Sequence, residues 1–566
     1  HHQRLFVILC LVAVALTGIV AYRDLPTEAF PDLTNNQVVV VTEAGGLTAT
    51  EVEQRVTYPI ETALMGLPGA QEVRSISKFE LSIITVVFDD NVNTYFARQI
   101  VNERLIEAKS RIPDTLSPTL GPVATAFGEI YQYLVEGDSV DPMERKTVHD
   151  WDIRTRLRSV PGVSEINSWG GLTKQFEVTV EPTQTERFGL SLRQVYDAIA
   201  ANNASFSGGF IEHHAERYTV RGVGLVTGVD DLSRIVVASV HGVPVLVGDV
   251  ATVRLSAMPR QGAVTRDGKG ESVAGMVIML KGENGKTVAE RVKAEIAELT
   301  ASLPKGMTLV PFYDQTEVID NTAYTVRKNL LEGSLLVVVV LIFFLRDVRA
   351  ALITAAVIPF SMLIGFIGMH LFGVSANLMS LGAIDFGLIV DGAVVMIENF
   401  VRRGHHPTPG PDGETPHHAR IRTSVEAATE VARPVLFGVL IIVAVYLPIF
   451  SLQGLEGKMF RPMAITVCSA ILGSLLLSLT AVPVFASYLL KPSAEHDGRW
   501  FVALRERYLR TLRSAMHHRW RTISLALVGV SVAIGSVPFL GTEFMPKLDE
   551  GSILVETRKL PSVSLE

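Results

Sequence analysis

Seven apolar stretches, each long enough to cross a bilayer as an α-helix, set the plan of the chain. They lie at about 5–22, 330–346, 350–372, 376–401, 434–452, 462–490 and 521–540. For the first stretch a cleaved signal peptide is the alternative, but no small-residue cleavage site follows it. About 300 residues of ordinary globular composition separate the first stretch from the second. The pattern predicts an α-helical polytopic membrane protein that carries one large folded domain.

The first part of this domain alternates between strand and helix patterns. The segment "NNQVVVVTEAGG" has the period of a strand, and a helix with a Thr cap follows it over about 48–69. Two strands occupy 70–88, and a second helix covers about 93–114. This β-α-β-β-α order is typical of ferredoxin-like split β-α-β units, so we expect an α+β fold here.

The same order recurs in the second part of the domain. A strand "EIYQYLVEG" precedes a helix over 143–159, two strands "GVSEINSW" and "TKQFEVTVE", and a helix over 191–202. A β-rich stretch at about 205–266 then interrupts the unit. It resumes with the strand "VAGMVIMLK", a helix over 285–302 and the strand "MTLVPFY". We interpret the interruption as an insertion.

Basic residues near the helix ends predict the orientation of the helices. Lys and Arg are concentrated in the loops that follow the second, fourth and sixth apolar stretches, whereas the opposite loops carry only Lys458 and Arg461. Loops rich in Lys and Arg stay in the cytoplasm. The N-terminus is therefore expected inside, and the large domain outside.

An internal repeat links the two ends of the chain. The segments starting at Leu25 and Leu540 share seven identical residues out of eighteen at a constant offset of 515. Both follow an apolar helix, as expected of parallel repeats in a membrane transporter. We therefore expect residue 540 to begin a second copy of the architecture, in a protein about twice as long.

These patterns divide the chain into seven segments. We expect a first transmembrane helix, two porter subdomains with the insertion in the second, helices two to six with a cytoplasmic loop at 402–433, a cytoplasmic amphipathic helix that lies on the bilayer surface, a seventh transmembrane helix, and the start of the second repeat. In the same order, the boundaries are 1–24, 25–135, 136–328, 329–490, 491–520, 521–540 and 541–566.

Composition supports the membrane class and excludes several others. Hydrophobic residues make up 48% of the chain, and the mean hydropathy is +0.32. A net charge of −7 implies no nucleic-acid partner, and two cysteines exclude a disulfide framework. The chain has no G-x4-GK[ST] loop, which argues against ATP as its energy source. No cofactor is indicated.

The fourth apolar stretch carries three carboxylates, Asp385, Asp391 and Glu398. Each ionised carboxylate at the centre of a membrane helix costs about 2.5–3.5 kcal/mol on insertion scales. Buried carboxyl groups that take up and release protons form the proton relays of pumps. The alternative is that these side chains pair with basic residues to hold helices together. That alternative is strongest for Glu398, because Arg402 follows four residues later.

Helical geometry separates the three carboxylates. At 100° per residue, Asp391 and Glu398 share one face of a continuous helix, whereas Asp385 lies about 120° away from Asp391. Small residues lie between them and would allow close approach of neighbouring helices: Gly382, Gly387, Gly392 and Ala393. No Lys or Arg lies in the middle of any predicted helix, so we expect a counter-charge from outside this chain.

The motifs resemble those of the heavy-metal efflux branch of the resistance–nodulation–division (RND) transporters. The most specific one is DFG-x3-DGA-x4-EN, present as Asp385-Phe386-Gly387, Asp391-Gly392-Ala393 and Glu398-Asn399. "GEIYQY", "VPGVSEINSWGGLTKQFEV" and "RPVLFGVLIIVAVYLPIF" also match, and the resemblance covers essentially the whole chain. It implies that the insertion at about 205–266 is a docking element.

This resemblance implies a homotrimer in the inner membrane of a Gram-negative bacterium. The pump would use the proton gradient and would work with a periplasmic adaptor and an outer-membrane channel. The resemblance also assigns proton translocation to Asp385, Asp391 and Glu398.

The same motif implies a divalent cargo such as zinc, cobalt, nickel or cadmium. Copper and silver pumps of the family have Ala in place of the residues that correspond to Asp385 and Gly392. A copper/silver pump and a multidrug pump of the same fold are the alternatives. A third is a proton-coupled accessory of protein or lipid export.

Candidate metal ligands follow from the resemblance and from residue type. By position, zinc-carrying family members use acidic residues near Glu129 and Glu165; the alternative is that both are surface or strand-end carboxylates. His213 and His214 are interpreted as a solvated turn. Two His pairs in the loop 405–418 are a second possible metal site, although the Pro- and Gly-rich sequence favours a spacer.

Overall fold

The computed structural model describes the chain in two compact units. The described residues are 4–28, 31–125, 128–137, 139–260, 262–345, 347–382, 384–405, 416–490, 499–539, 553 and 555–559. A helical unit comprises His1–Leu33 and Glu317–Lys559, and an α+β unit comprises Thr34–Thr316.

The first sheet of the α+β unit has the strand order β3-β4-β2-β5, and all of its neighbours are antiparallel. Its strands are β2 (Gln37–Glu43), β3 (Ala70–Lys78), β4 (Leu81–Phe88) and β5 (Thr119–Leu120). Alternate residues of β2 and β4 are buried against the helices, as the period of two predicts. This is the order of a ferredoxin-like unit.

Two helical segments cover this first sheet. One is continuous through α2 (Ala49–Val52), a π-helical turn (Glu53–Thr57) and α3 (Tyr58–Leu64), and the other is α4 (Thr94–Ala108). A capping box between Thr48 and Glu51 begins the first segment, and Asn93 caps α4. The caps stand at the positions where polar residues precede the apolar periodic pattern. The predicted helices are thus confirmed.

The second sheet repeats the same topology with the order β15-β6-β14-β7. Its strands are β6 (Glu129–Glu136), β7 (Val163–Gly170), β14 (Val273–Met279) and β15 (Thr308–Asp314). One helical segment runs through α5 (Pro142–Val148), a π-helical turn (His149–Ile153) and α6 (Arg154–Arg158); the other is α11 (Gly285–Ser302). A core of buried side chains from β6, β14 and both helical segments lies between the layers.

The insertion in this second unit is wider than the predicted 205–266. The strand β8 (Lys174–Val180), assigned by sequence to the split β-α-β unit, pairs instead with β13 (Ala251–Ala257) in a separate two-stranded sheet. The place beside β6 and β7 belongs to β14. All but one residue of β14 are buried, whereas β8 is partly exposed along its length. The more apolar strand takes the middle of the sheet, because only there are both of its faces covered.

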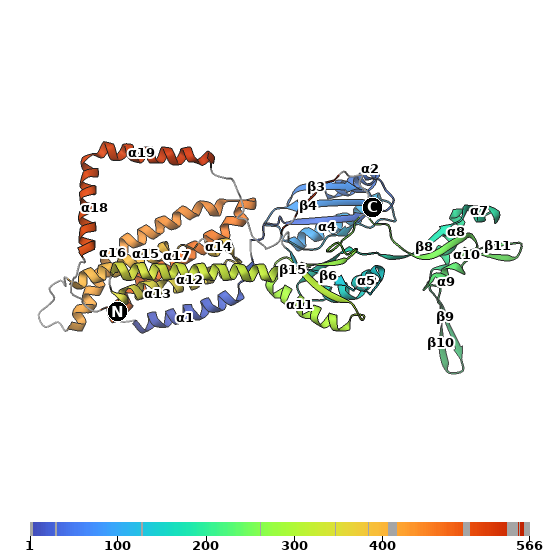
Figure 1. Cartoon of the computed structure of the whole chain (residues 1–566), viewed down its shortest axis with the longest axis horizontal. Coiled ribbons are helices and arrows are strands. Elements are labelled where there is room, and N and C mark those ends of the chain that lie inside the picture. Colours follow the sequence, from blue (N-terminus) through green and yellow to red (C-terminus); the bar gives the residue numbers. More distant parts are fainter. Residues whose placement is uncertain are drawn as a thin grey trace. The chain divides into compact units, whose positions relative to one another are not determined.

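Between β8 and β13 the inserted element contains further elements (Figure 1). These are α7 (Pro182–Arg187), α8 (Leu192–Asn202), the hairpin β9 (Phe206–His213) and β10 (Glu216–Gly222), α9 (Val229–Ser233), the pair β11 (Val236–Val240) and β12 (Val243–Leu246), and α10 (Val247–Val250). The expectation of a β-rich insertion is met, but its boundaries are set by strand pairing that the local pattern does not reveal.

Long helices dominate the helical unit (Figure 1). Those described are α1 (Arg4–Asp24), α12 (Gln315–Leu345), α13 (Val348–Leu371), α15 (Phe386–His405), α16 (Pro416–Tyr446), α17 (Gly454–Leu489), α18 (Arg499–His517) and α19 (Arg519–Ser536). The described residues contain six spans long and apolar enough to cross a membrane. The span predicted at 330–346 belongs to α12 but is not among the six, so the count of seven stays a prediction.

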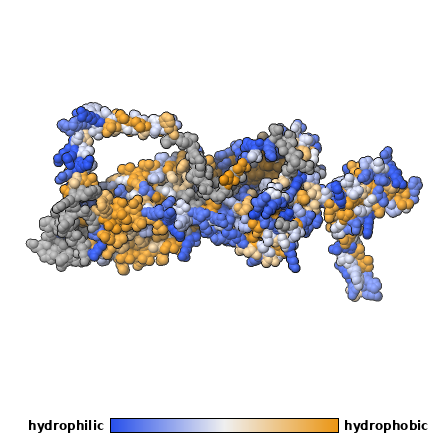
Figure 2. Space-filling model, viewed as in Figure 1, coloured by the Kyte–Doolittle hydropathy of each residue, from blue (hydrophilic) through white to orange (hydrophobic). Residues whose placement is uncertain are grey.

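The helix α17 lies at the centre of the packed helices. It contacts α1, α13, α15 and α16. Small residues bring α13 and α17 close together: a Cβ added to Gly473 would lie 2.8 Å from Cβ of Ile364. Figure 2 shows a broad apolar surface over the helices, as expected for a unit that a bilayer surrounds.

The predicted second repeat falls largely outside the described residues. After residue 539 only Ile553 and residues 555–559 are described, and they form neither helix nor strand. The structure therefore does not test this part of the domain plan.

The close fit of β14 against β6 leads to a stability prediction. A Cβ added to Gly275 would lie 2.2 Å from Cζ of Tyr133, which is fully buried, so Gly275→Ala should destabilise the α+β unit by about 1–3 kcal/mol through overpacking. Gly45→Ala, where nothing lies within 4 Å, is the matched control. Denaturant unfolding of both variants checks this, and equal midpoints would contradict it.

Candidate functional site

The acidic stretch is not one continuous helix. The short helix α14 (Leu378–Gly382) ends before Ala383, and α15 begins at Phe386. Asp385 precedes α15, and its carboxylate accepts a hydrogen bond from the backbone N–H of Gly387 at 2.8 Å. Asp385 therefore caps the helix. The predicted angle of 120° between Asp385 and Asp391 stays a prediction, and the break in the helix lies on the N-terminal side of Asp385.

The other two carboxylates share one face of α15, as predicted. Asp391 and Glu398 are both exposed and lie two turns apart, about 10 Å along the axis. The opposite face is buried against α13, α16 and α17 through Ile389, Ala393, Met396, Ile397 and Phe400. The described part of the chain thus leaves the acidic face of α15 uncovered. No described Lys or Arg forms an ion pair with Asp385, Asp391 or Glu398.

The alternative of an ion pair between Glu398 and Arg402 is wrong. Arg402 instead lies 3.3 Å from a carboxylate oxygen of Glu430 on α16, and Arg403 lies 2.9 Å from the other. Asn399 joins this network by donating to the Ala427 carbonyl at 2.7 Å. Asn399, Arg402 and Arg403 therefore bind the end of α15 to α16. Glu398 has no basic partner among the described residues.

One of the predicted small residues brings helices together at the acidic segment. A Cβ added to Gly392 would lie 3.1 Å from Cγ1 of Val435 and 3.3 Å from Oγ of Ser478. Ser474, one turn before Ser478, donates to the Ile389 carbonyl, whereas the buried Ser478 hydroxyl has no partner among the described residues. Gly392 is thus a contact point of α15 with α16 and α17. Gly382 and Gly387 are not such points.

The second candidate site lies on the sheet β15-β6-β14-β7. Glu129 begins β6, Glu165 lies on β7, and both are in register with Ile278 of the intervening strand β14. With about 4.8 Å between neighbouring strands, the two backbones are about 10 Å apart at this level. The sheet therefore places two glutamates that are 36 positions apart in sequence on either side of Ile278.

The two glutamates have different surroundings. Glu129 is exposed, and Gln132 donates to it over a long 3.4 Å. Glu165 is only 21% exposed, and its two oxygens face two arginines: Arg154 at 2.9 Å and Arg158 at 3.7 Å. Ion pairs with this degree of solvent exposure contribute only about 0.2–1 kcal/mol each to stability.

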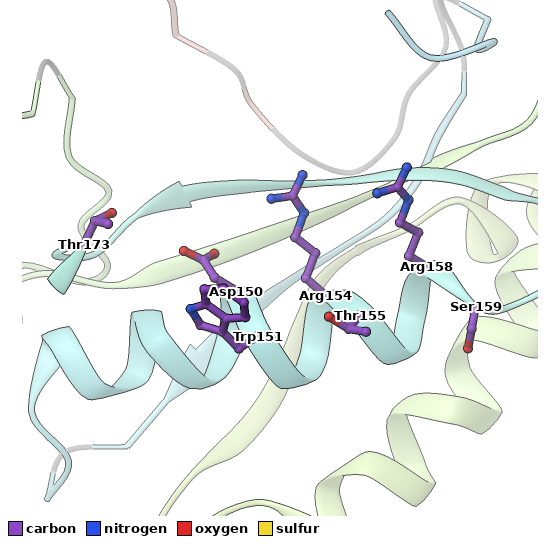
Figure 3. A pocket seen from close by; sticks show the side chains of 7 residues that line it. All are labelled: Asp150, Trp151, Arg154, Thr155, Arg158, Ser159 and Thr173. Carbon is purple, nitrogen blue, oxygen red and sulfur yellow. The ribbon is translucent and has the colours of Figure 1, made fainter. Parts of the chain in front are cut away.

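Both arginines also line a groove on the helical segment (Figure 3). They extend to the same side from successive turns of the helix. The groove has a volume of about 700 Å³, and its other lining residues are Asp150, Trp151, Thr155, Ser159 and Thr173. Sequence reasoning did not single out these arginines, because nothing in their local pattern distinguishes them from ordinary helix-surface charges.

A buried polar cluster fixes this helical segment to the sheet. His149 is fully buried between the hydroxyl of Tyr133 at 3.1 Å and that of Ser168 at 3.0 Å. Asp150 lies 3.1 Å from both the His149 ring and the Lys146 ammonium. Burial lowers the pKa of His149, so the ring stays neutral. Burial alone would raise the pKa of Asp150, but the hydrogen bonds from His149 and Lys146 hold it at about 2.

The histidine candidates are only partly among the described residues. His213 ends β9 and His214 follows in the exposed turn of the hairpin, as interpreted from sequence. Residues 406–415 of the candidate loop lie outside the described residues. Among the described residues no group of three or more His, Cys, Asp or Glu side chains could hold a metal ion.

Comparisons with known proteins identify the class. Residues 2–566 match the AcrB/AcrD/AcrF family, so the chain belongs to this family of RND transporters. Its helices and family make it a multi-pass membrane protein of the inner membrane.

Particular relatives place it in the heavy-metal branch. The chain is 43% identical to the cation efflux system protein CzcA of Alcaligenes sp. (strain CT14), covering 100% of this chain and 54% of that protein. It is 38% identical to the nickel and cobalt resistance protein CnrA of Cupriavidus metallidurans, again over 100% of this chain and 55% of the relative. Identity to the cation efflux system protein CusA of Escherichia coli K12 is 34%, with 99% and 54% covered. The chain thus spans about half the length of these curated relatives.

A solved structure supports the same placement. The crystal structure of a heavy metal efflux pump matches with a TM-score of 0.83 and 38% identity, covering 94% of this chain and 51% of that one. The predicted fold class and family are confirmed.

The neutral, buried His149 predicts a pH-dependent stability. Its pKa in the folded chain lies below the usual value of about 6.5, so the unfolded chain binds the proton more readily and stability falls as the pH drops below about 6.5. His149→Gln should flatten this dependence by up to about 1.4 kcal/mol per pH unit. Guanidinium unfolding followed by tryptophan fluorescence between pH 7 and 5 measures it. The exposed His213→Gln is the control; the same slope in the wild type and His149→Gln would contradict the prediction.

Proposed function

We propose that this chain serves in a proton-driven antiporter that exports divalent heavy-metal cations: zinc, cobalt, nickel or cadmium. It would form the inner-membrane pump of a tripartite efflux system, as a homotrimer with a periplasmic adaptor and an outer-membrane channel. The α+β unit would lie in the periplasm. The names of the relatives support a metal cargo, and the observation that carries the proposal is the uncovered acidic face of α15.

The acidic face of α15 cannot be exposed to the hydrocarbon of the bilayer. An ionised carboxylate at the bilayer centre costs about 2.5–3.5 kcal/mol or more, and two of them point from the same side of α15. They need water, a proton or a protein partner. We assign the cover to helices of the second half that the longer relatives have, and assign proton translocation to Asp391, Glu398 and Asp385.

The break before α15 suits Asp385 to a different role from the other two. Its carboxylate carries a charge and caps the helix at once. Protonation would weaken the cap, because a neutral carboxyl group is a poorer acceptor for the helix N-terminus. Protonation at this position would therefore alter how α15 begins, whereas at Asp391 and Glu398 it changes only the charge of the exposed face.

Metal binding would occur at Glu129 and Glu165. Carboxylate oxygens suit borderline divalent cations better than they suit Cu(I), which prefers thiolate and thioether ligands. Two carboxylates are too few for a complete coordination sphere, so the remaining ligands would come from water or from the rest of the protein. The cation is cargo, so incomplete coordination by fixed ligands favours its release.

Asp391 is the test of the proton pathway. In full-length protein, Asp391→Asn should reduce metal resistance and proton-coupled transport in liposomes to background, because the amide cannot take up a proton. Asp385→Asn keeps a good helix cap and removes the charge. Any loss of transport in this variant is therefore due to the loss of the charge alone. Folding is checked by circular dichroism. Retained proton-coupled transport by Asp391→Asn would refute the assignment.

Glu165 and Glu129 are the test of the metal site. Glu165→Gln and Glu129→Gln should each weaken Zn²⁺ binding by about tenfold or more, since each removes one charged ligand from a site with few of them. Titration with Zn²⁺, Co²⁺, Ni²⁺, Cd²⁺ and Cu⁺ ranks the ions. Glu295→Gln, which removes an acidic residue paired with Arg156, is the control. Unchanged Zn²⁺ affinity in both variants would exclude this site.

A further inference from the structure

The two proposed metal ligands are not equally available. Glu129 forms no ion pair with a described residue, and its one hydrogen bond, from Gln132, is long. Glu165, by contrast, has one guanidinium at each carboxylate oxygen: Arg154 at Oε1 and Arg158 at Oε2. A divalent cation that bridges the two glutamates therefore meets one open ligand and one that is already occupied.

We infer that Arg154 and Arg158 form a clamp that competes with the divalent cation for Glu165, and that metal binding releases both arginines into the groove beside Trp151. This inference rests on the proposed function, because it takes Glu165 as a metal ligand. It assigns to the two arginines a role in setting the affinity for the cargo.

Competition follows from charge and from space. A cation bound to Glu165 brings two positive charges to within about 2 Å of oxygens that a guanidinium already contacts. Arginine stays protonated at any relevant pH, so the repulsion is not relieved by loss of a proton. It is relieved only if the guanidinium moves away. Because both ion pairs are partly exposed to water, they are weak enough for a divalent cation to displace them.

The groove offers the displaced arginines a new environment. Arg154 is 42% exposed and Arg158 60% exposed, so both side chains can move without first leaving a packed core. Trp151 is 76% exposed on the same helical segment and provides a ring face for stacking, and Asp150 provides a carboxylate one turn before Arg154 (Figure 3). When the two guanidinium groups leave Glu165, neither positive charge is therefore left without a favourable partner.

The segment that carries the clamp does not move easily. His149 and Asp150 are tied to β6 and β7 through Tyr133 and Ser168, directly before Arg154 in the chain. The backbone positions of the arginines are thereby held relative to Glu165, and only the side chains need to swing. An affinity set in this way suits a pump, since a cargo ion that binds too tightly is not released.

The experiment measures Zn²⁺ affinity of the purified chain in detergent at neutral pH, by isothermal titration or by competition with a chelating dye. Arg154→Gln should bind Zn²⁺ about two- to fivefold more tightly than the wild type, as expected from removal of a partly exposed ion pair. Arg158→Gln, whose contact is longer, should show a smaller gain, and the double variant the largest. Arg156→Gln removes the same charge from the same helix but pairs with Glu295, so its affinity should not change.

Two further variants separate the possible failures. If Glu165→Gln leaves Zn²⁺ binding unchanged, the proposed metal site is wrong. If Glu165→Gln weakens binding but Arg154→Gln does not tighten it, the clamp alone is overturned. Equal tightening in Arg156→Gln would show a general effect of charge and would also overturn the clamp. Arg154→Lys keeps the charge without the fork of donors and should show an intermediate gain; it serves as the measurement if Arg154→Gln does not fold.

Discussion

Hydrocarbon cannot solvate a charge, and the helical unit is arranged around this constraint. The apolar segment formed by α14 and α15 carries three carboxylates. The backbone polar groups of this segment are satisfied within its helices. The structure places the apolar face of α15 against α13, α16 and α17 and turns Asp391 and Glu398 the other way. The basic residues at the end of this helix do not neutralise them, because Glu430 holds Arg402 and Arg403. Within the described residues, the acidic face of α15 thus has no basic partner.

Two acidic residues of the α+β unit, Glu165 and Asp150, have partners of their own. Here water is near, and Glu165 is held by two arginines while Asp150 is held by Lys146 and His149. Each of these carboxylates has a described partner of opposite or neutral polarity. Among the described residues, Glu165 and Asp150 therefore have partners that offset their charge, whereas Asp391 and Glu398 have no basic partner.

Both units depend on close backbone approach at a few small residues. Gly275 allows the ring of Tyr133 to lie across β14, and Gly392 allows α15 to contact α16 and α17. In each case the neighbour is a residue of functional interest: Tyr133 contacts His149, and Gly392 follows Asp391. The backbone beside each site is thus supported by close packing.

The local pattern of apolar and polar residues predicts much of this structure. The features that it does not predict have a physical reason. The apolar runs, the strands and helices of both α+β repeats, and the shared face of Asp391 and Glu398 were predictable because each depends on a period of 2 or 3.6 residues or on a cap. Four features could not be predicted from the local pattern. They are the break before Phe386, the place of β14 instead of β8 in the sheet, the ion pair of Arg402 with Glu430, and the contacts of the clamp with Glu165. Each depends on which distant segment competes best for a partner, and only tertiary structure decides that competition.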